Sequence, residues 1–138
     1  MTFHMPIILG GLALVVLTLL LAFWTSIQRG RSGIIAYNAP LDPASGMAKA
    51  QRAHGNAAEF SALLIGLFLI TSVVYQGRDL GLAVTSLVVA ITVARWLSAI
   101  GFLACETLER PHILKAIGAL VTYIGGLALT IMTAVKLV

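Results

Sequence analysis

The chain has 138 residues, of which 59% are hydrophobic and 10% are charged, and its mean hydropathy is +1.01. Soluble domains carry about 25% charged residues, so this composition excludes a soluble globular protein. The net charge of +4 is small and the basic residues are not interleaved with aromatic ones, which argues against a nucleic-acid partner. One cysteine, Cys105, excludes an internal disulfide, and no histidines stand at ligand spacing, so no metal site is expected.

Four apolar stretches follow one another along the chain, at about residues 6–27, 56–75, 80–103 and 112–135. Each is close to the roughly 20 residues that a membrane-spanning helix needs. The first has no basic segment before it and no A-x-A cleavage site after it, so we interpret it as a retained helix rather than a signal peptide. The sequence therefore predicts one all-α domain, an integral membrane four-helix bundle.

The connections divide the basic residues unevenly. Residues 28–51 are predicted to form one long loop, residues 76–79 a tight turn, and residues 104–111 a third connection. In a four-span protein the first and third connections share a side. That side would hold six basic residues (Arg29, Arg31, Lys49, Arg52, Arg110 and Lys115), and the other side only Arg78 and Lys136. The positive-inside rule then places the first and third loops in the cytoplasm and both termini outside.

Small residues recur every four positions in the second and third stretches: Ala58, Ala62 and Gly66, then Ser86, Ala90, Ala94 and Ser98. Such stripes allow helix backbones to approach closely in lipid, so we expect helices to pack on these faces. Alanine and glycine are also simply frequent in membrane helices, which is the plainer interpretation.

A polar cluster opens the second stretch, in RAHGNAAEF. Arg52, Asn56 and Glu59 are spaced i, i+4 and i+7, which places a cation, an amide and an anion on one helical face. Each alone has an ordinary explanation: a topology anchor, a helix cap or an ion-pair partner. Together they favour a site for a small zwitterionic ligand.

Arg95 lies inside the third stretch, where an arginine is costly unless it meets an anion or a water-filled cleft. We expect it to face the same cleft as Glu59. Two alternatives stay open: a structural Arg95–Glu59 pair that joins two helices, and a side chain that extends to the headgroups.

These motifs resemble those of the MAPEG family, the membrane-associated proteins in eicosanoid and glutathione metabolism. RAHGNAAEF resembles the family signature R-x-x-x-N-x-x-E-[YF], and ARWLSAIGF is similar to its second block. The resemblance covers essentially the whole chain and is to a bacterial-type member. It implies a homotrimer in the bacterial inner membrane, with glutathione as co-substrate in clefts between subunits and a lipophilic substrate that enters from the bilayer.

The resemblance also implies which residues bind glutathione: Arg52, Asn56, Glu59, Phe60, Arg95 and Ser98. The chain departs from the family at three positions. Phe60 and Phe102 stand where family members have tyrosines, and Ser98 stands where many bacterial members have histidine.

The chemistry of glutathione suits such a site, because arginines bind its carboxylates and an acid binds its ammonium group. Its thiol becomes a good nucleophile only when ionised, and a guanidinium near the sulfur favours the thiolate. Arg29, Arg31 and Arg110 are the catalytic candidates for this role. The predicted activity is a glutathione-dependent transferase or peroxidase acting on lipophilic electrophiles. The alternatives are a non-catalytic protein that binds lipid or a partner protein in the same cleft, and a small exporter of lipophilic cations, against which Arg52 and Arg95 argue.

Overall fold

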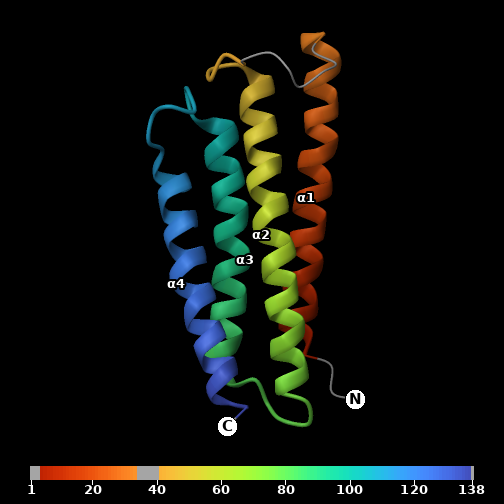
Figure 1. The fold of residues 1–138 in the computed structure, drawn as a ribbon, viewed down its shortest axis with the longest axis vertical. Coiled ribbons are helices and arrows are strands. Elements are labelled where there is room, and N and C mark those ends of the chain that lie inside the picture. Colours follow the sequence, from red (N-terminus) through yellow and green to blue (C-terminus); the bar gives the residue numbers. More distant parts are fainter. Residues whose placement is uncertain (1–3, 34–40, 138) are drawn as a thin grey trace.

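The computed structural model describes residues 4–33 and 41–137. These residues form four helices and no strand: α1 (Met5–Ser32), α2 (Gly46–Val74), α3 (Gly81–Ala104) and α4 (Ile113–Val135). The helices run alternately up and down in one elongated bundle (Figure 1). Each is long and apolar enough to cross a membrane. The predicted all-α four-helix bundle is thus confirmed.

The ends of α1 show why this segment forms a long helix. Pro6 lies in the first turn, where its fixed φ suits a helix start and its missing N–H costs nothing. Arg29 and Arg31 lie in the last turn, where cations interact favourably with the helix dipole. Gly33 follows with a φ of 65°, the left-handed conformation that commonly ends helices.

α2 begins at Gly46, about ten residues before the second predicted span, so the long loop predicted over residues 28–51 is shorter than expected. Ser45 caps the helix, because its Oγ accepts a hydrogen bond of 3.1 Å from the Ala48 N–H. The reason for the difference is that apolarity marks the part of a helix that lies in lipid, not its end. The alanine-rich segment before Asn56 forms helix readily although it is partly polar. Arg52 and Asn56 therefore lie well inside α2, and Asn56 is not a cap.

The connections α1–α2 and α3–α4 meet at one end of the bundle. The Leu108 N–H donates to the Pro43 carbonyl over 3.1 Å, and Lys49 Nζ donates to the Cys105 carbonyl over 3.3 Å. The α2–α3 connection, the start of α1 and the end of α4 lie at the opposite end (Figure 1). The predicted grouping of the basic residues at one end of the bundle therefore agrees with the structure. Which side of the membrane this end faces stays a prediction.

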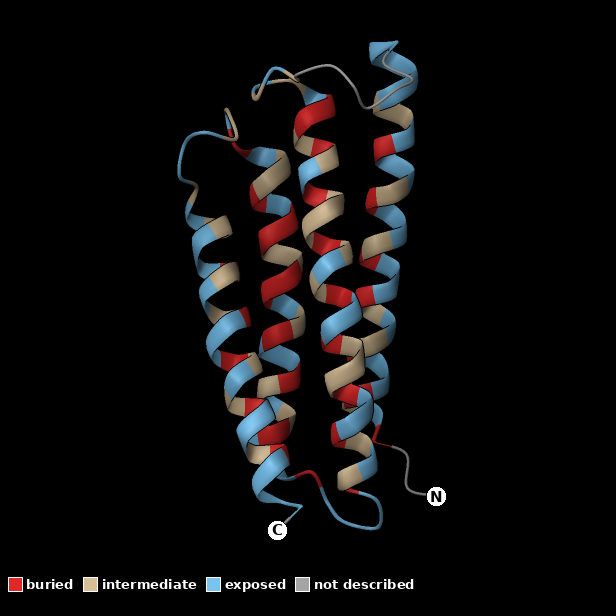
Figure 2. Cartoon of the chain, in the orientation of Figure 1, coloured by how far each residue is buried: buried red, intermediate tan, exposed pale blue. Residues whose placement is uncertain are grey.

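Burial is concentrated on the faces that the helices turn toward one another (Figure 2). Leu14, Leu64, Val88, Ile91 and Leu129 form the centre of the main core cluster and are at most 2% exposed. Polar contacts also join the helices: the Thr18 hydroxyl donates to Ser61 Oγ, and the hydroxyls of Thr71 and Thr133 lie 2.9 Å apart. Such bonds satisfy polar groups that lipid cannot solvate.

The small-residue stripes are only partly buried within one chain. Ala94 and Ser98 of α3 are buried against α4, where a Cβ placed on Gly118 would lie 2.6 Å from the Ala94 carbonyl oxygen and closer still to Ser98 Oγ. Ala62 and Ala90, in contrast, are exposed. The close packing expected on these faces therefore holds in one chain only for the α3–α4 contact.

Candidate functional site

Arg95 is the largest fully buried side chain, and it lies in the middle of the bundle at 2% exposure. Its Nη2 donates to Asn56 Oδ1 over 2.5 Å and to the Asn56 carbonyl over 3.2 Å. Its guanidinium carbon lies 4.6 Å from the centre of the Phe60 ring. Its Nε is buried and has no hydrogen-bond partner among the described residues. A buried cation held only by neutral groups is an incomplete arrangement, because desolvated charges require a counter-charge.

Glu59 does not supply that counter-charge. Within the described parts of the chain, the ion pair formed is Arg110–Glu106. These residues therefore contain no structural Arg95–Glu59 pair, which was one of the alternatives for Arg95. At 3.6 residues per turn, Glu59 is rotated about 60° around α2 from Asn56. Asn56 therefore faces Arg95, while Glu59 is exposed.

Four of the predicted site residues line one groove between α2, α3 and α4: Arg52, Asn56, Arg95 and Ser98. Phe102, Lys115 and Tyr123 complete its polar and aromatic lining, and we call it the Arg95 groove. Its volume is about 340 Å³, within the usual range for small-molecule sites. The groove presents three cationic side chains, Arg52, Arg95 and Lys115, and no carboxylate in its lining, so its ligand should carry negative charge.

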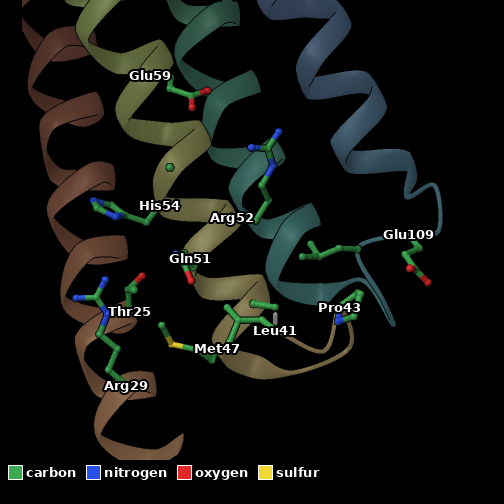
Figure 3. A pocket seen from close by; sticks show the side chains of 13 residues that line it. Thr25, Arg29, Leu41, Pro43, Met47, Gln51, Arg52, His54, Glu59 and Glu109 are labelled. Atoms are coloured by element: carbon green, nitrogen blue, oxygen red, sulfur yellow. The ribbon is translucent and has the colours of Figure 1, made fainter. Parts of the chain in front are cut away.

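A larger pocket of about 700 Å³ lies toward the connections, on the other side of Arg52 (Figure 3). Arg29, Arg52, His54 and Glu59 are among its lining residues. His54 points toward α1, away from Arg52 (Figure 3). Arg52 lines both this pocket and the Arg95 groove. It thereby connects the two, with the Glu59 carboxylate on one side and the Arg95 cation on the other.

The three arginines predicted to stabilise a thiolate lie in different surroundings. Arg29 lines the larger pocket. The Arg31 guanidinium lies 5.7 Å from the centre of the Trp24 ring. Arg110 forms a solvent-exposed ion pair of 2.7 Å with Glu106. Arg31 and Arg110 line neither pocket of this chain.

Lys115 and Tyr123 line the groove but are not among the site residues predicted from the sequence. Lys115 Nζ donates to the Arg110 carbonyl over 2.9 Å and lies 5.5 Å from the centre of the Phe102 ring. A signal for both was present, because Lys115, Ala119 and Tyr123 recur every four residues and thus share one face of α4. The predicted binding residue Phe60 is adjacent, and its ring contacts both the Arg95 guanidinium and the Tyr123 ring.

Comparison with known proteins shows to which family the chain belongs. The chain matches the model of the MAPEG family over residues 7–135. No curated protein and no solved structure matches it. The match spans nearly the whole chain, includes all four helices and agrees with their membrane-spanning character. This integral membrane protein of four apolar helices therefore belongs to the MAPEG family.

Proposed function

We propose that this chain binds glutathione in the Arg95 groove and conjugates it to lipophilic electrophiles taken from the bilayer. The observation that carries the proposal is the state of Arg95. It is a buried cation whose Nε lacks a partner among the described residues and which borders a groove lined by two further cations. An anionic ligand would complete this arrangement, and the MAPEG family includes glutathione-using members.

The charged groups of the site correspond to those of glutathione. The tripeptide carries two carboxylates and one ammonium group. Arg52 and Lys115 offer separate cations for the carboxylates, and Arg95 offers a guanidinium already oriented by Asn56. Glu59 and Arg52 both line the adjoining pocket, where a carboxylate suits the ammonium group. Phe60 would hold Arg95 through its ring face rather than contact the ligand through a hydroxyl.

Conjugation requires the thiol to lose its proton, and a free thiol has a pKa of about 8.5. A cation beside the sulfur lowers that pKa and raises the fraction of thiolate. Of the three predicted candidates, Arg29 lines the larger pocket within one chain, and Arg52 lines the same pocket. Arg31 and Arg110 remain candidates for a cleft that a neighbouring subunit completes.

The same proposal includes a homotrimer in the membrane. Ala62 is exposed on α2, and a Cβ on nearby Gly66 would meet nothing within 4 Å in one chain. This small-residue face is free to receive a helix of another copy. With the first and third loops in the cytoplasm, the groove would open to cytosolic glutathione at one end and to lipid along its side.

A calorimetric titration of glutathione into detergent-purified protein tests the proposal. Arg52→Ala should weaken binding by about 1.5–3 kcal/mol, the scale of a hydrogen bond to a charged group, which is roughly 10- to 150-fold in Kd. The matched control is Arg78→Ala, which removes an exposed cation at the opposite end of the bundle and should leave Kd unchanged. Wild-type protein without measurable binding, or equal affinities for the two variants, would contradict the proposal.

A further inference from the structure

Tyr123, in the middle of α4, lines the Arg95 groove and carries a phenol hydroxyl. The residue is 57% exposed, and its neighbours on the outer surface of α4 are apolar and equally open: Leu120 at 58%, Ile124 at 62% and Leu127 at 64%. Tyr123 therefore belongs both to the groove and to a surface that meets hydrocarbon in a spanning helix. A molecule that enters the groove from the lipid would pass this hydroxyl.

The Tyr123 hydroxyl has no hydrogen-bond partner within residues 4–33 and 41–137. Arg95 Nε, in the same groove, also has none among these residues. In a bilayer there is no bulk water to replace such a partner, so an unpaired hydroxyl at this depth carries a cost. A ligand oxygen would remove that cost. Thr122, the preceding residue, shows the ordinary alternative, because its hydroxyl donates to the Gly118 carbonyl within α4.

The ring that carries this hydroxyl is held in place. Its centre lies 5.7 Å from the centre of the Phe60 ring at an interplanar angle of 41°, and the Arg95 guanidinium lies over that same Phe60 ring. Tyr123, Phe60, Arg95 and Asn56 thus form one connected arrangement from the lipid surface to the buried cation. The groove has a tyrosine on its lipid side and the buried Arg95 cation on its inner side.

We infer that Tyr123 donates a hydrogen bond to the substrate oxygen on which negative charge develops, and that the chain consequently favours α,β-unsaturated aldehydes and ketones among lipophilic electrophiles. This inference rests on the proposed glutathione conjugation and names the substrate class for the same site. Preorganised donors aimed at a developing oxyanion are a strong source of rate acceleration in a site from which water is excluded.

The reaction balances without a further reactant. The glutathione thiolate, whose proton has gone to water, forms a carbon–sulfur bond at the β-carbon of the unsaturated carbonyl. The electron pair of the carbon–carbon double bond shifts to give an enolate, whose oxygen accepts the Tyr123 hydrogen bond. Water then returns one proton to the α-carbon. The product is the saturated thioether, and Tyr123 keeps its proton throughout. Displacement of chloride from benzyl chloride creates no oxyanion and gains nothing from this donor.

The test compares two substrates, trans-2-nonenal and benzyl chloride, in purified wild-type protein and Tyr123→Phe. The phenylalanine keeps the ring contact with Phe60 and removes the hydroxyl alone. Turnover of nonenal should fall about 100-fold, the effect of removing one oxyanion donor, and this loss should be far larger than any change in the turnover of benzyl chloride or in the calorimetric Kd for glutathione. Tyr75→Phe is the matched control, because Tyr75 is buried at the opposite end of the bundle, and it should leave both reactions unchanged.

The other outcomes separate the two proposals. If Tyr123→Phe lowers both reactions equally or leaves both unchanged, the role of Tyr123 is refuted and glutathione conjugation stands. The same holds if the wild-type protein conjugates benzyl chloride but not nonenal. If the wild-type protein conjugates neither substrate and binds no glutathione, the proposed function fails and this inference fails with it.

Discussion

At the scale of single residues, Arg95 shows how a membrane bundle holds a charge without pairing it to an acid. Two acceptors on Asn56 and the face of the Phe60 ring surround the guanidinium, and Nε is left over. Neutral groups of this kind stabilise the cation enough for folding but do not neutralise it. The residual positive charge remains for an anion that enters the groove, which links the packing of Arg95 to its proposed function.

The exchange of Asn56 for alanine tests that account of folding. Asn56→Ala removes the Oδ1 acceptor and leaves only the backbone carbonyl, so the free energy of unfolding in detergent should fall by about 1.5–3 kcal/mol without ligand. Glu59→Gln is the matched control. Because Glu59 is exposed and forms no ion pair among the described residues, its change should stay within about 0.5 kcal/mol. Loss of stability in Glu59→Gln and not in Asn56→Ala would show that the acid holds Arg95 after all.

Part of the groove lining was predictable from the sequence. Helical spacing placed Arg52 and Asn56 on one face of α2, and the cost of an intramembrane arginine singled out Arg95. Glu59, predicted on the same face, lines only the adjoining pocket. The partner of Arg95 was not predictable in the same way. A rotation of about 60° around α2 decides between Asn56 and Glu59, and the packing of α2 against α3 sets that rotation. Tyr123 shares a face of α4 with Lys115, but this spacing does not show that the face lines the groove rather than the lipid surface.

At the scale of helices, α3 and α4 approach closely where a glycine of each helix faces the other helix. A Cβ on Gly118 would lie 2.6 Å from the Ala94 carbonyl oxygen and 2.9 Å from the Ser98 backbone nitrogen, and backbone atoms cannot move aside cheaply. A Cβ on Gly101 would lie 2.7 Å from the Lys115 backbone nitrogen. This contact sets the position of Lys115 and Tyr123 relative to Arg95, so the groove depends on it.

Gly118→Ala should therefore force α3 and α4 apart and lower the free energy of unfolding by about 1–3 kcal/mol, the usual cost of overpacking. Glutathione affinity should fall as well, because the groove widens. Gly30→Ala is the matched control, since a Cβ at Gly30 in α1 meets nothing within 4 Å, and it should not destabilise the protein. Melting curves and titrations of both variants check this. Equal stability of the two variants would mean that the α3–α4 contact is looser than described.

Helix ends were the least predictable feature at this scale. Hydropathy located all four helices, and three begin and end within about five residues of the predicted spans. α2 was the exception because its first turns lie outside the apolar stretch and are held by the Ser45 cap and by alanine-rich sequence. The stripes of small residues predicted close packing but not which helix would lie opposite. Repeated small residues do not identify the neighbouring helix.

At the scale of the whole molecule, the two ends of the bundle differ in charge. The end that carries the α1–α2 and α3–α4 connections holds most of the arginines and lysines, and it is also where the larger pocket lies. The positive-inside rule predicts that this end lies in the cytoplasm. In the proposed function, cytosolic glutathione would then reach the pocket directly, and the lipophilic substrate would arrive through the bilayer.

Cysteine labelling in intact cells and inverted vesicles tests the orientation, in a Cys105→Ala background. Ser32→Cys lies at the connection end and Asp79→Cys at the opposite end, and both positions are exposed. A membrane-impermeant maleimide should label Asp79→Cys from outside and Ser32→Cys only from the cytoplasmic side. Labelling of both from one side would refute a four-span chain, and the reversed pattern would refute the proposed orientation alone.

The central claim is that a bound anion completes the buried Arg95 side chain. Nuclear magnetic resonance of the arginine Nε–H groups in detergent-solubilised protein tests it most directly, with the Arg95 resonance assigned by its loss in Arg95→Lys. This resonance should shift saturably as glutathione is added, with the Kd that calorimetry gives, because Nε gains its missing acceptor. Saturable binding of glutathione that leaves the Arg95 resonance unmoved would contradict the account and place the ligand elsewhere.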